Sequence, residues 1–335
     1  MLIRKKYRGN DERKKNILLF MTDFYGYHND IVNEIKNQGW DVTWYQDKVK
    51  FSVWESALSK LSDNHKKKKF MRYFNDVLKK EENNKFDVIL IVFGAGFMTG
   101  EHIEKIRMTF PDTKIVYYAW DSVSNFPTIK SLSEHADVAF SFDKDDCKKY
   151  NVNFLPLFYV KKDAQAETTA YKWDVSTVMS FYNKKSHGLL LIMDVLPKNI
   201  SKYLFVRLRN KSYFVYMRIV NHAAFGKLKK YLTFNSLTRE ECLSVFRNSK
   251  AIIDCPVPNQ NGLTMRTFEA LALKRKLITT NIHIKEYDFY CSDNIFVVDE
   301  NTKEIPLEFF ETPFNKTYSI SEKYGLSNFV HTLLD

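Results

Sequence analysis

Short apolar runs alternate with amphipathic segments along most of the chain. The first run is Asn16–Met21, and the segment Asn29–Asn37 after it places Ile31, Val32 and Ile35 on one helical face. Further on, "DVILIVF" (87–93) and "KIVYYAW" (114–120) are almost continuously apolar, which is typical of parallel strands buried on both faces. The pattern therefore predicts an α/β fold in which helices cover both sides of a parallel sheet.

The strand-like runs form two sets, separated by the polar stretch "YVKKDAQAETTAY" (159–171), which has no regular period. A chain of 335 residues is also longer than a single core usually grows. We therefore predict two doubly wound, Rossmann-like domains that face a central cleft. The predicted parts are an amino-terminal, acceptor-side domain (1–160), a linker (161–172), a carboxyl-terminal, donor-side domain (173–318) and a terminal helix (319–335), for which packing back on the first domain is one arrangement.

The composition fits a folded chain, because 44% of the residues are apolar and 15% are aromatic. The sequence has neither a run of about 18 apolar residues nor the apolar core of a signal peptide, so we expect a cytosolic protein. The cysteines form no close pair, which argues against a zinc site or a disulfide framework. We expect four buried, reduced thiols at Cys147, Cys242, Cys255 and Cys291.

The net charge of +11 comes largely from three basic segments, which are Arg4–Lys15, Lys66–Lys69 with Arg72, and Arg207–Lys230. In the last segment the basic residues alternate with aromatic ones. Such a face suits an anionic membrane or single-stranded nucleic acid, and a solvated face that binds neither is equally compatible. Of the two ligands we expect the membrane surface and no nucleic acid.

Ligands of open parallel sheets bind at the carboxyl ends of the strands, so the residues that follow each strand are candidates for chemistry. Asp121 follows "KIVYYAW" and is the first choice for a general base, with Asp23 and His28 in the first loop as alternatives. Structural roles compete with this reading. Asp121 can cap the helix that follows, and His28 can cap or solvate the helix from Asn29.

Three aromatic residues also lie at these strand ends. Tyr25, Tyr27 and Trp120 can stack on the apolar faces of an acceptor sugar. Aromatic residues at strand ends also often belong to the core. The sequence leaves both interpretations open.

In the second half, the strand "AIIDCP" leads into a glycine-centred loop and a short helix, "NGLTMRTFEALA" (261–272). Gly262 permits a tight turn there, and Thr264 can cap the helix. The helix amino terminus and Arg266 suit a diphosphate, and Glu269 can accept both hydroxyls of a ribose. A local ion pair between Arg266 and Glu269 on a surface helix is the alternative.

Four segments together resemble GT-B glycosyltransferases, and most closely the bacterial CgeB-like and capsule or lipopolysaccharide type. The segments are "FYGYHNDIVNEIKNQGWDV" (24–42), "YYAWDS" (117–122), "HADVAFSFDKDDCKKYNVNFLPLFY" (135–159) and "GLTMRTFEALALKRKLITTN" (262–281). In that family a glutamate eight positions after an acidic residue binds the donor ribose. Here Glu269 stands at the second position, but Asn261 replaces the acidic residue at the first.

The resemblance implies transfer of a sugar from a nucleotide-sugar donor to a hydroxyl on a saccharide or lipid-linked saccharide. The donor site that it implies consists of Asn261, Gly262, Leu263, Thr264, Arg266, Glu269 and Asn281. The turn "SFYNKKSHG" (180–188) adds Lys184, Lys185 and Ser186 as secondary phosphate contacts, although a plain exposed turn fits equally well.

The resemblance further implies that neither a cofactor nor a bound metal is needed, because a helix dipole and basic side chains neutralise the leaving diphosphate. The acidic cluster Asp143, Asp145 and Asp146 reads as the first turn of a helix. The predicted function is glycosyl transfer in bacterial surface polysaccharide synthesis at the inner face of the membrane. Two alternatives stay open, which are a sugar-nucleotide epimerase of the same fold and a non-catalytic protein that binds nucleic acid or membranes.

Overall fold

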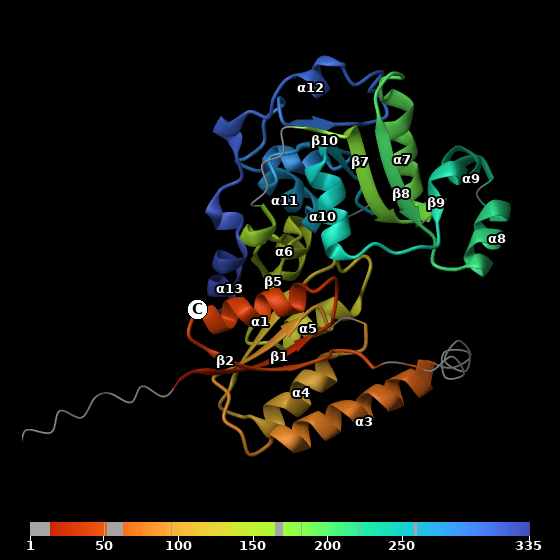
Figure 1. Cartoon of the computed structure of the whole chain (residues 1–335). Helices are drawn as coiled ribbons and strands as arrows, with labels where there is room; N and C mark the ends of the chain where they lie inside the picture. Colours follow the sequence, from red (N-terminus) through yellow and green to blue (C-terminus); the bar gives the residue numbers. More distant parts are fainter. Residues whose placement is uncertain are drawn as a thin grey trace, which may run out of the picture.

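The first half of the chain forms a parallel sheet of six strands in the order β2-β1-β3-β4-β5-β6 (Figure 1). The structure is a computed structural model, and it describes residues 14–49, 51, 63–94, 96–164, 170–181, 183–220, 222–257 and 260–335. The strands are β1 Asn16–Met21, β2 Asp41–Tyr45, β3 Val88–Val92, β4 Lys114–Ala119, β5 Val138–Ser141 and β6 Asn153–Phe154. The helices are α1 Tyr27–Asn37, α3 Asp63–Glu81, α4 Gly100–Thr109, α5 Thr128–His135 and α6 Lys144–Tyr150.

Alternate side chains of the central strands enter two separate cores, as expected for a sheet covered on both faces. Leu18 and Phe20 of β1 pack with residues of α3, α4 and α5 on one face. Ile17 and Leu19 pack with residues of α1 and of the terminal helix on the other. All four side chains have no exposed surface.

The second half repeats this plan with a sheet in the order β12-β11-β10-β7-β8-β9. Its strands are β7 Trp173–Ser180, β8 Lys202–Arg207, β9 Leu232–Thr233, β10 Ser249–Asp254, β11 Lys276–Thr279 and β12 Ile295–Val297. The helices are α7 Asn183–Val195, α8 Lys211–Val220, α9 His222–Leu228, α10 Arg239–Arg247, α11 Met265–Ala272, α12 Glu308–Glu311 and α13 Leu326–Leu334. Short 3-10 turns occur at Lys161–Ala164, Lys229–Tyr231, Ile282–Glu286, Lys316–Tyr318 and Glu322–Tyr324.

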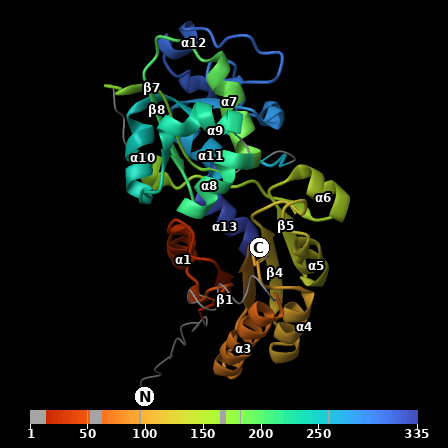
Figure 2. The ribbon, with the colours of Figure 1, turned by 90° about the vertical axis from the view of Figure 1, so that its right-hand side faces the viewer.

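These two sheets confirm the predicted fold class of two doubly wound α/β halves with a helix at the carboxyl terminus (Figures 1 and 2). The terminal helix is shorter than expected and starts at Leu326 instead of residue 319. Tyr159 accounts for the late start, because its backbone N–H donates to the carbonyl of Tyr324 and its carbonyl accepts from the N–H of Leu326. These two bonds hold the chain extended at Gly325, so the helix begins after it.

Two smaller expectations need correction. Helices α8 and α9 and strand β9 lie within the basic segment 207–230 and just after it, where the sequence suggested only a charged, aromatic stretch.

Of the four cysteines, which are all free thiols, only Cys255 is buried, while the others are half-buried. In the described ranges, the helices are too short or too polar to cross a bilayer.

The terminal helix α13 packs on the first half of the chain. The Phe329 ring lies 4.8 Å from the Tyr118 ring of β4 and 4.6 Å from the Phe158 ring, measured between centroids. Phe329 is 2% exposed. This aromatic cluster places the end of the chain against the carboxyl ends of the first sheet.

Arg239 of α10 provides a polar link between the two halves. Its guanidinium donates to the carboxylates of Asp30 in α1 and Asp163 in the turn Lys161–Ala164, and it lies 4.4 Å from the centre of the Tyr27 ring. Lys162 Nζ also lies 2.6 Å from Asp30. The Asp30 side chain is only 4% exposed, so its charge depends on these two cations.

We expect Arg239→Gln to lower the free energy of unfolding by about 3 kcal/mol, because Asp30 then keeps a buried charge with one cation fewer. Lys14→Gln is the matched control. It breaks an ion pair with Asp41 whose side chains are 56% and 55% exposed, and it should change stability by less than about 1 kcal/mol. Urea titrations measure both variants. Equal losses would contradict a structural role for the Arg239 link.

Candidate functional site

A cavity of about 990 Å³ lies between the carboxyl ends of the two sheets. On one side it is lined by residues that follow β1 and β4, and on the other by the ends of β7, β8 and β10 and by α11. In the second sheet β7 and β10 are neighbours. From β7 the strand order continues outward to β8 on one side, and from β10 it continues to β11 on the other, so the cavity lies at a topological switch point. The size is that of a pocket for a small molecule.

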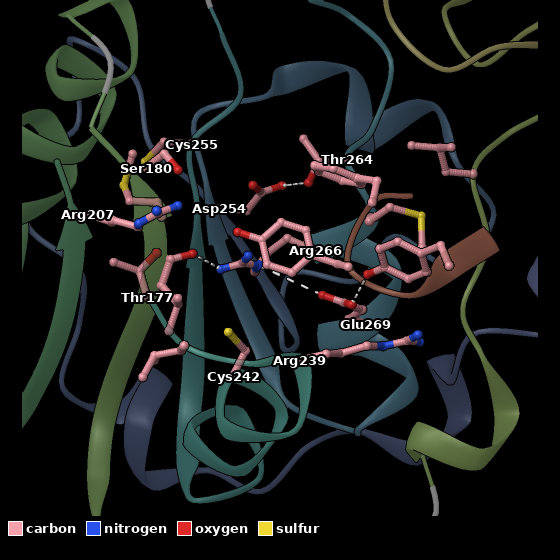
Figure 3. Close-up of a pocket in the computed structure, with 18 of the residues that line it drawn as sticks. Thr177, Ser180, Arg207, Arg239, Cys242, Asp254, Cys255, Thr264, Arg266 and Glu269 are labelled. Atoms are coloured by element: carbon pink, nitrogen blue, oxygen red, sulfur yellow. Dashed lines mark hydrogen bonds and ion pairs between the residues drawn. The ribbon is translucent and has the colours of Figure 1, made fainter. Parts of the chain in front are cut away.

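Glu269 and Arg266 of α11 both face this cavity (Figure 3). Glu269 accepts a hydrogen bond from the Tyr27 hydroxyl of the first half, and its other oxygen lies 4.0 Å from Arg266 Nε. The Glu269 side chain is 11% exposed. Burial raises the pKa of its carboxyl above the ordinary 4.5, against the opposing effects of Arg266 and the Tyr27 hydroxyl. The pair is thus not the solvated surface pair of the alternative interpretation.

Arg266 is positioned by the second sheet. Its guanidinium donates to the Val178 carbonyl of β7 at 2.5 Å and lies 4.5 Å from the centre of the Phe246 ring. These contacts hold the cation at the end of β7, where an anionic ligand in the cavity would meet it.

Asp254, at the end of β10, lies beside the amino terminus of helix α11. Its Oδ2 accepts from the hydroxyls of Thr264 at 2.7 Å and Thr267 at 3.0 Å. Thr264 is the N-cap residue by position, but its side chain makes no capping bond to the helix backbone, so the capping role expected from the sequence is wrong. The carboxylate offsets part of the positive potential of the helix amino terminus.

Arg207 is a cavity residue that sequence reasoning placed only in a basic segment. It ends β8, its side chain lines the cavity, and the residue is exposed (Figure 3). Its position after an apolar strand, "YLFVR", was the signal that could have identified it. Within the described part of the chain, the guanidinium of Arg207 has no acidic partner, which leaves it available to an anion.

Asp121 and Asp23 lie on the wall formed by the first half. Asp121 Oδ1 accepts from the Ser122 N–H and from Asn125 Nδ2, each at 2.8 Å. Helix α5 begins only at Thr128, so Asp121 closes the turn after β4 and does not cap a helix. Asp23 is more open, with 54% of its side chain exposed.

His28 is not among the residues that line the cavity. It belongs to the first turn of α1, is 6% exposed, and stacks on Trp44 with 4.5 Å between ring centroids. Its Nδ1 lies 3.1 Å from Asp23 Oδ1. His28 therefore lies behind Asp23, and it neither caps the helix nor faces solvent.

The three aromatic candidates line the cavity but differ in environment. Tyr27 is 5% exposed and engaged with Glu269 and Arg239, so little of its ring is available for stacking on a sugar. Trp120 is half-buried and packs 5.9 Å from the Tyr27 ring centre. Tyr25 is 48% exposed and has a left-handed backbone with φ of 47°. Of the three, Tyr25 presents the most free surface.

Asn261, Gly262, Leu263 and Asn281 do not line the cavity. The backbone N–H groups of Asn261 and Gly262 donate to Asp143 Oδ2 at 3.1 and 3.2 Å, and the Asn261 side chain donates to Asp145. Asn281 Nδ2 donates to the Asn261 carbonyl at 3.1 Å. The sequence predicted that these residues bind the nucleotide sugar, whereas in the structure Asn261 and Gly262 contact the first half and Asn281 supports their loop.

Gly262 is required by packing and not by an unusual φ angle. A Cβ atom there would lie 2.5 Å from the Phe142 ring and 2.8 Å from the Phe142 carbonyl, which is backbone of the first half. Leu263, beside it, is 1% exposed and belongs to the core. The tight turn expected from the sequence is in fact a close approach between the halves.

The remaining sequence candidates add little to the site. The side chains of Lys184 and Lys185 lie outside the described residues, and Ser186 is buried. Asp143 caps α6 by accepting from the N–H groups of Asp145 and Asp146, as expected for an acidic first turn. The described ranges contain no group of three or more His, Cys, Asp or Glu side chains placed to hold a metal ion.

Comparisons with known proteins agree with the fold. No protein-family model and no curated protein matches the chain. Among solved structures, Anabaena HepE in complex with UDP-glucose is 9% identical with a TM-score of 0.55, over 96% of this chain and 95% of that one. A glycosyltransferase from Rickettsia africae is 11% identical with a TM-score of 0.56, over 96% and 94% of the two chains. UDP-GlcNAc 2-epimerase from Neisseria meningitidis, bound to UDP-GlcNAc, is 11% identical with a TM-score of 0.51, over 96% and 98%. The chain therefore has the GT-B architecture of two Rossmann-like halves.

Proposed function

We propose that this protein is a glycosyltransferase that moves a sugar from a nucleotide-sugar donor to a hydroxyl group of an acceptor. The observation that carries the proposal is the cavity itself. It brings Glu269, Arg266 and Arg207 of the second half opposite the carboxylates of Asp121 and Asp23 of the first half. Cations and a buried carboxylate on one wall suit a nucleoside diphosphate, and carboxylates on the other suit activation of a hydroxyl.

In this proposal the donor binds against the second half. Glu269 accepts hydrogen bonds from the ribose hydroxyls, and the guanidinium groups of Arg207 and Arg266 neutralise the diphosphate. Arg207 contributes more to neutralising the diphosphate than the sequence suggested, because Asp254 already places a negative charge near the start of α11. One oxygen of Glu269 is engaged by Tyr27, so donor binding either shares this contact or replaces it.

The acceptor binds against the first half. Its hydroxyl oxygen attacks the anomeric carbon of the donor sugar, the bond from that carbon to the diphosphate oxygen breaks, and the hydroxyl proton passes to the Asp121 carboxylate. The negative charge that develops on the leaving diphosphate is stabilised by the two arginines. Tyr25 offers the exposed ring on which an acceptor sugar can stack.

The GT-B neighbours support this choice of donor, since the HepE structure contains UDP-glucose and the Rickettsia africae glycosyltransferase shares the fold. The epimerase neighbour keeps sugar-nucleotide epimerisation as a second candidate. That reaction needs further acid and base groups around the donor sugar. Of the described acidic residues that line the donor side of the cavity, Asp254 is held by two threonines and Glu269 is assigned to the ribose, which favours transfer.

Four finer parts of the proposal come from the sequence. They are a role in bacterial surface polysaccharide synthesis, either lipopolysaccharide or capsule, the CgeB-like subgroup, catalysis without a metal or cofactor, and attachment to the inner face of a membrane. They agree with the proposed chemistry. Assays with added chelator and with lipid-linked acceptors address them directly.

A thermal-shift screen of nucleotides and nucleotide sugars tests the proposed function. A ligand that binds only the native state raises the unfolding midpoint by mass action. We expect a diphosphate nucleotide sugar to raise the midpoint, and the same compound to lose its sugar to an acceptor in a transfer assay. Interconversion of the sugar without an acceptor would favour the epimerase, and no response to any nucleotide sugar would refute both.

The pH dependence of donor binding gives a sharper test of Glu269. Its pKa is raised, so the carboxyl group takes up a proton while the pH is still above the ordinary glutamate range. The protonated group can no longer accept both ribose hydroxyls, so donor affinity should fall as the pH is lowered, and the fall should begin above the pH at which an ordinary glutamate takes up its proton. Calorimetry with wild type and with Glu269→Gln measures this. The amide introduced by the substitution does not titrate, so an equal decline in both proteins would contradict the assignment.

A further inference from the structure

Helix α8 presents an apolar ridge to solvent. Val215 and Ile219 stand one turn apart, and so do Tyr216 and Val220, which places all four on one side of the helix. They are 56%, 75%, 56% and 54% exposed, respectively. The helix is anchored through its opposite side, where Met217 is fully buried in the core of the second half. An exposed aliphatic ridge of this kind usually marks a surface for a partner.

The surroundings of the ridge are positively charged. The 44 residues from Val195 to Thr238 contain nine lysines and arginines and no aspartate or glutamate. Arg209, Lys211 and Arg218 are exposed around the ridge, as are Lys229 and Lys230 after α9. Asp194, just before this stretch, pairs with Lys227 at 2.8 Å and neutralises one of its cations. The density of positive charge in this stretch is therefore higher than the average for the whole chain.

We infer that α8 is an interfacial helix that binds the surface of an anionic lipid bilayer. Its aliphatic side chains enter the boundary between headgroups and acyl chains, and the surrounding cations contact the anionic headgroups. A second copy of this chain fits less well, because a two-fold contact would place the same positive residues opposite one another. Single-stranded nucleic acid also fits less well, because three of the four ridge residues are aliphatic and cannot stack on bases as aromatic rings do.

The position of α8 relates the bilayer to the cavity. The strand that leads to α8 ends at Arg207, which lines the cavity, and α8 starts four residues later. Figures 1 and 2 show α8 on the same side of the molecule as the amino-terminal end of α3, where Lys67, Lys68 and Arg72 are exposed. Both halves thus offer cations on one side. A bilayer there would lie beside the interdomain cavity, which suits an acceptor with a lipid tail if the proposed transferase function holds.

Flotation with lipid vesicles tests the inference. Full-length protein is mixed with vesicles of phosphatidylcholine, either pure or with about 30% phosphatidylglycerol, at low ionic strength. We expect wild-type protein to float with the anionic vesicles and much less with the neutral ones. The double variant Val215→Ser, Ile219→Ser should bind the anionic vesicles at least about tenfold more weakly. In Arg209→Gln, Lys211→Gln and Arg218→Gln, each lost cation should cost roughly fivefold.

Met108→Ser is the matched control, because Met108 is an apolar side chain with 79% exposure on α4, in the other half. It should float like wild type. Unchanged binding of the double variant, with its thermal midpoint intact, would overturn the inference. The inference would also be overturned if neither protein floated and the wild type were a dimer that the double substitution converts to monomers. Flotation uses no donor, so vesicle binding by a protein that ignores every nucleotide sugar would refute the transferase proposal alone.

Discussion

Asp121→Asn is expected to reduce turnover roughly a thousandfold while leaving donor affinity within about twofold of wild type. The asparagine keeps a carbonyl oxygen that can accept from the Ser122 N–H and from Asn125, so the turn after β4 is retained. What is lost is the capacity to take the acceptor proton. Turnover with a donor identified by thermal shift, together with calorimetric donor binding, separates the two effects.

The alternative base provides the control for this experiment. Asp23 lines the same wall, and His28 lies 3.1 Å behind it. Asp23→Asn should affect turnover far less than Asp121→Asn if Asp121 is the base. Full turnover in Asp121→Asn, with loss in Asp23→Asn, would transfer the role to Asp23 and would make His28 the group that orients it.

The second large effect is expected from Glu269→Ala, which should weaken donor binding roughly a hundredfold. A carboxylate that accepts two ribose hydroxyls makes two charge-assisted hydrogen bonds, each contributing about 1.5 kcal/mol or more, and about 1.4 kcal/mol corresponds to a factor of ten. Calorimetric titration with the donor and with the free nucleoside diphosphate should show the same loss, because both carry the ribose.

Tyr27→Phe is the matched control for Glu269→Ala. Both changes remove the hydrogen bond between Tyr27 and Glu269, but only the second removes the carboxylate. If the loss of donor affinity in Glu269→Ala merely reflected a disturbed contact between the two halves, Tyr27→Phe would reproduce it. Retained donor affinity in Tyr27→Phe, with a large loss in Glu269→Ala, identifies the carboxylate as the binding group.

The positions of the strands and the general location of the site could be predicted from the sequence. Runs such as Val88–Val92 are apolar at every position because the strand is buried on both faces, and this requirement is visible in a few consecutive residues. The rule that ligands meet the carboxyl ends of parallel strands then directs attention to Asp23 and Asp121, both of which line the cavity. These inferences depend on local periodicity and on chain order alone.

The division of labour within the loops could not be predicted in this way. Gly262 and Asn261 follow a strand just as Asp121 does, yet they contact Asp143 and Phe142 of the other half and do not line the cavity. For Tyr27 the sequence left stacking on a sugar and burial in the core both open, and the structure buries it with its hydroxyl donating to Glu269, which lies 242 residues away in the chain. Arg207 looked like one basic residue among many, and it faces the cavity.

Each of these outcomes depends on how the two halves meet. Strand and helix types follow from the spacing of apolar residues within about ten positions, because burial repeats with the period of the local backbone. Whether a polar residue at a strand end contacts a ligand, the opposite half or water depends on groups that are hundreds of residues away. No local period encodes that choice, so it was decided only when the tertiary structure brought α1, α10 and α11 together around one cavity.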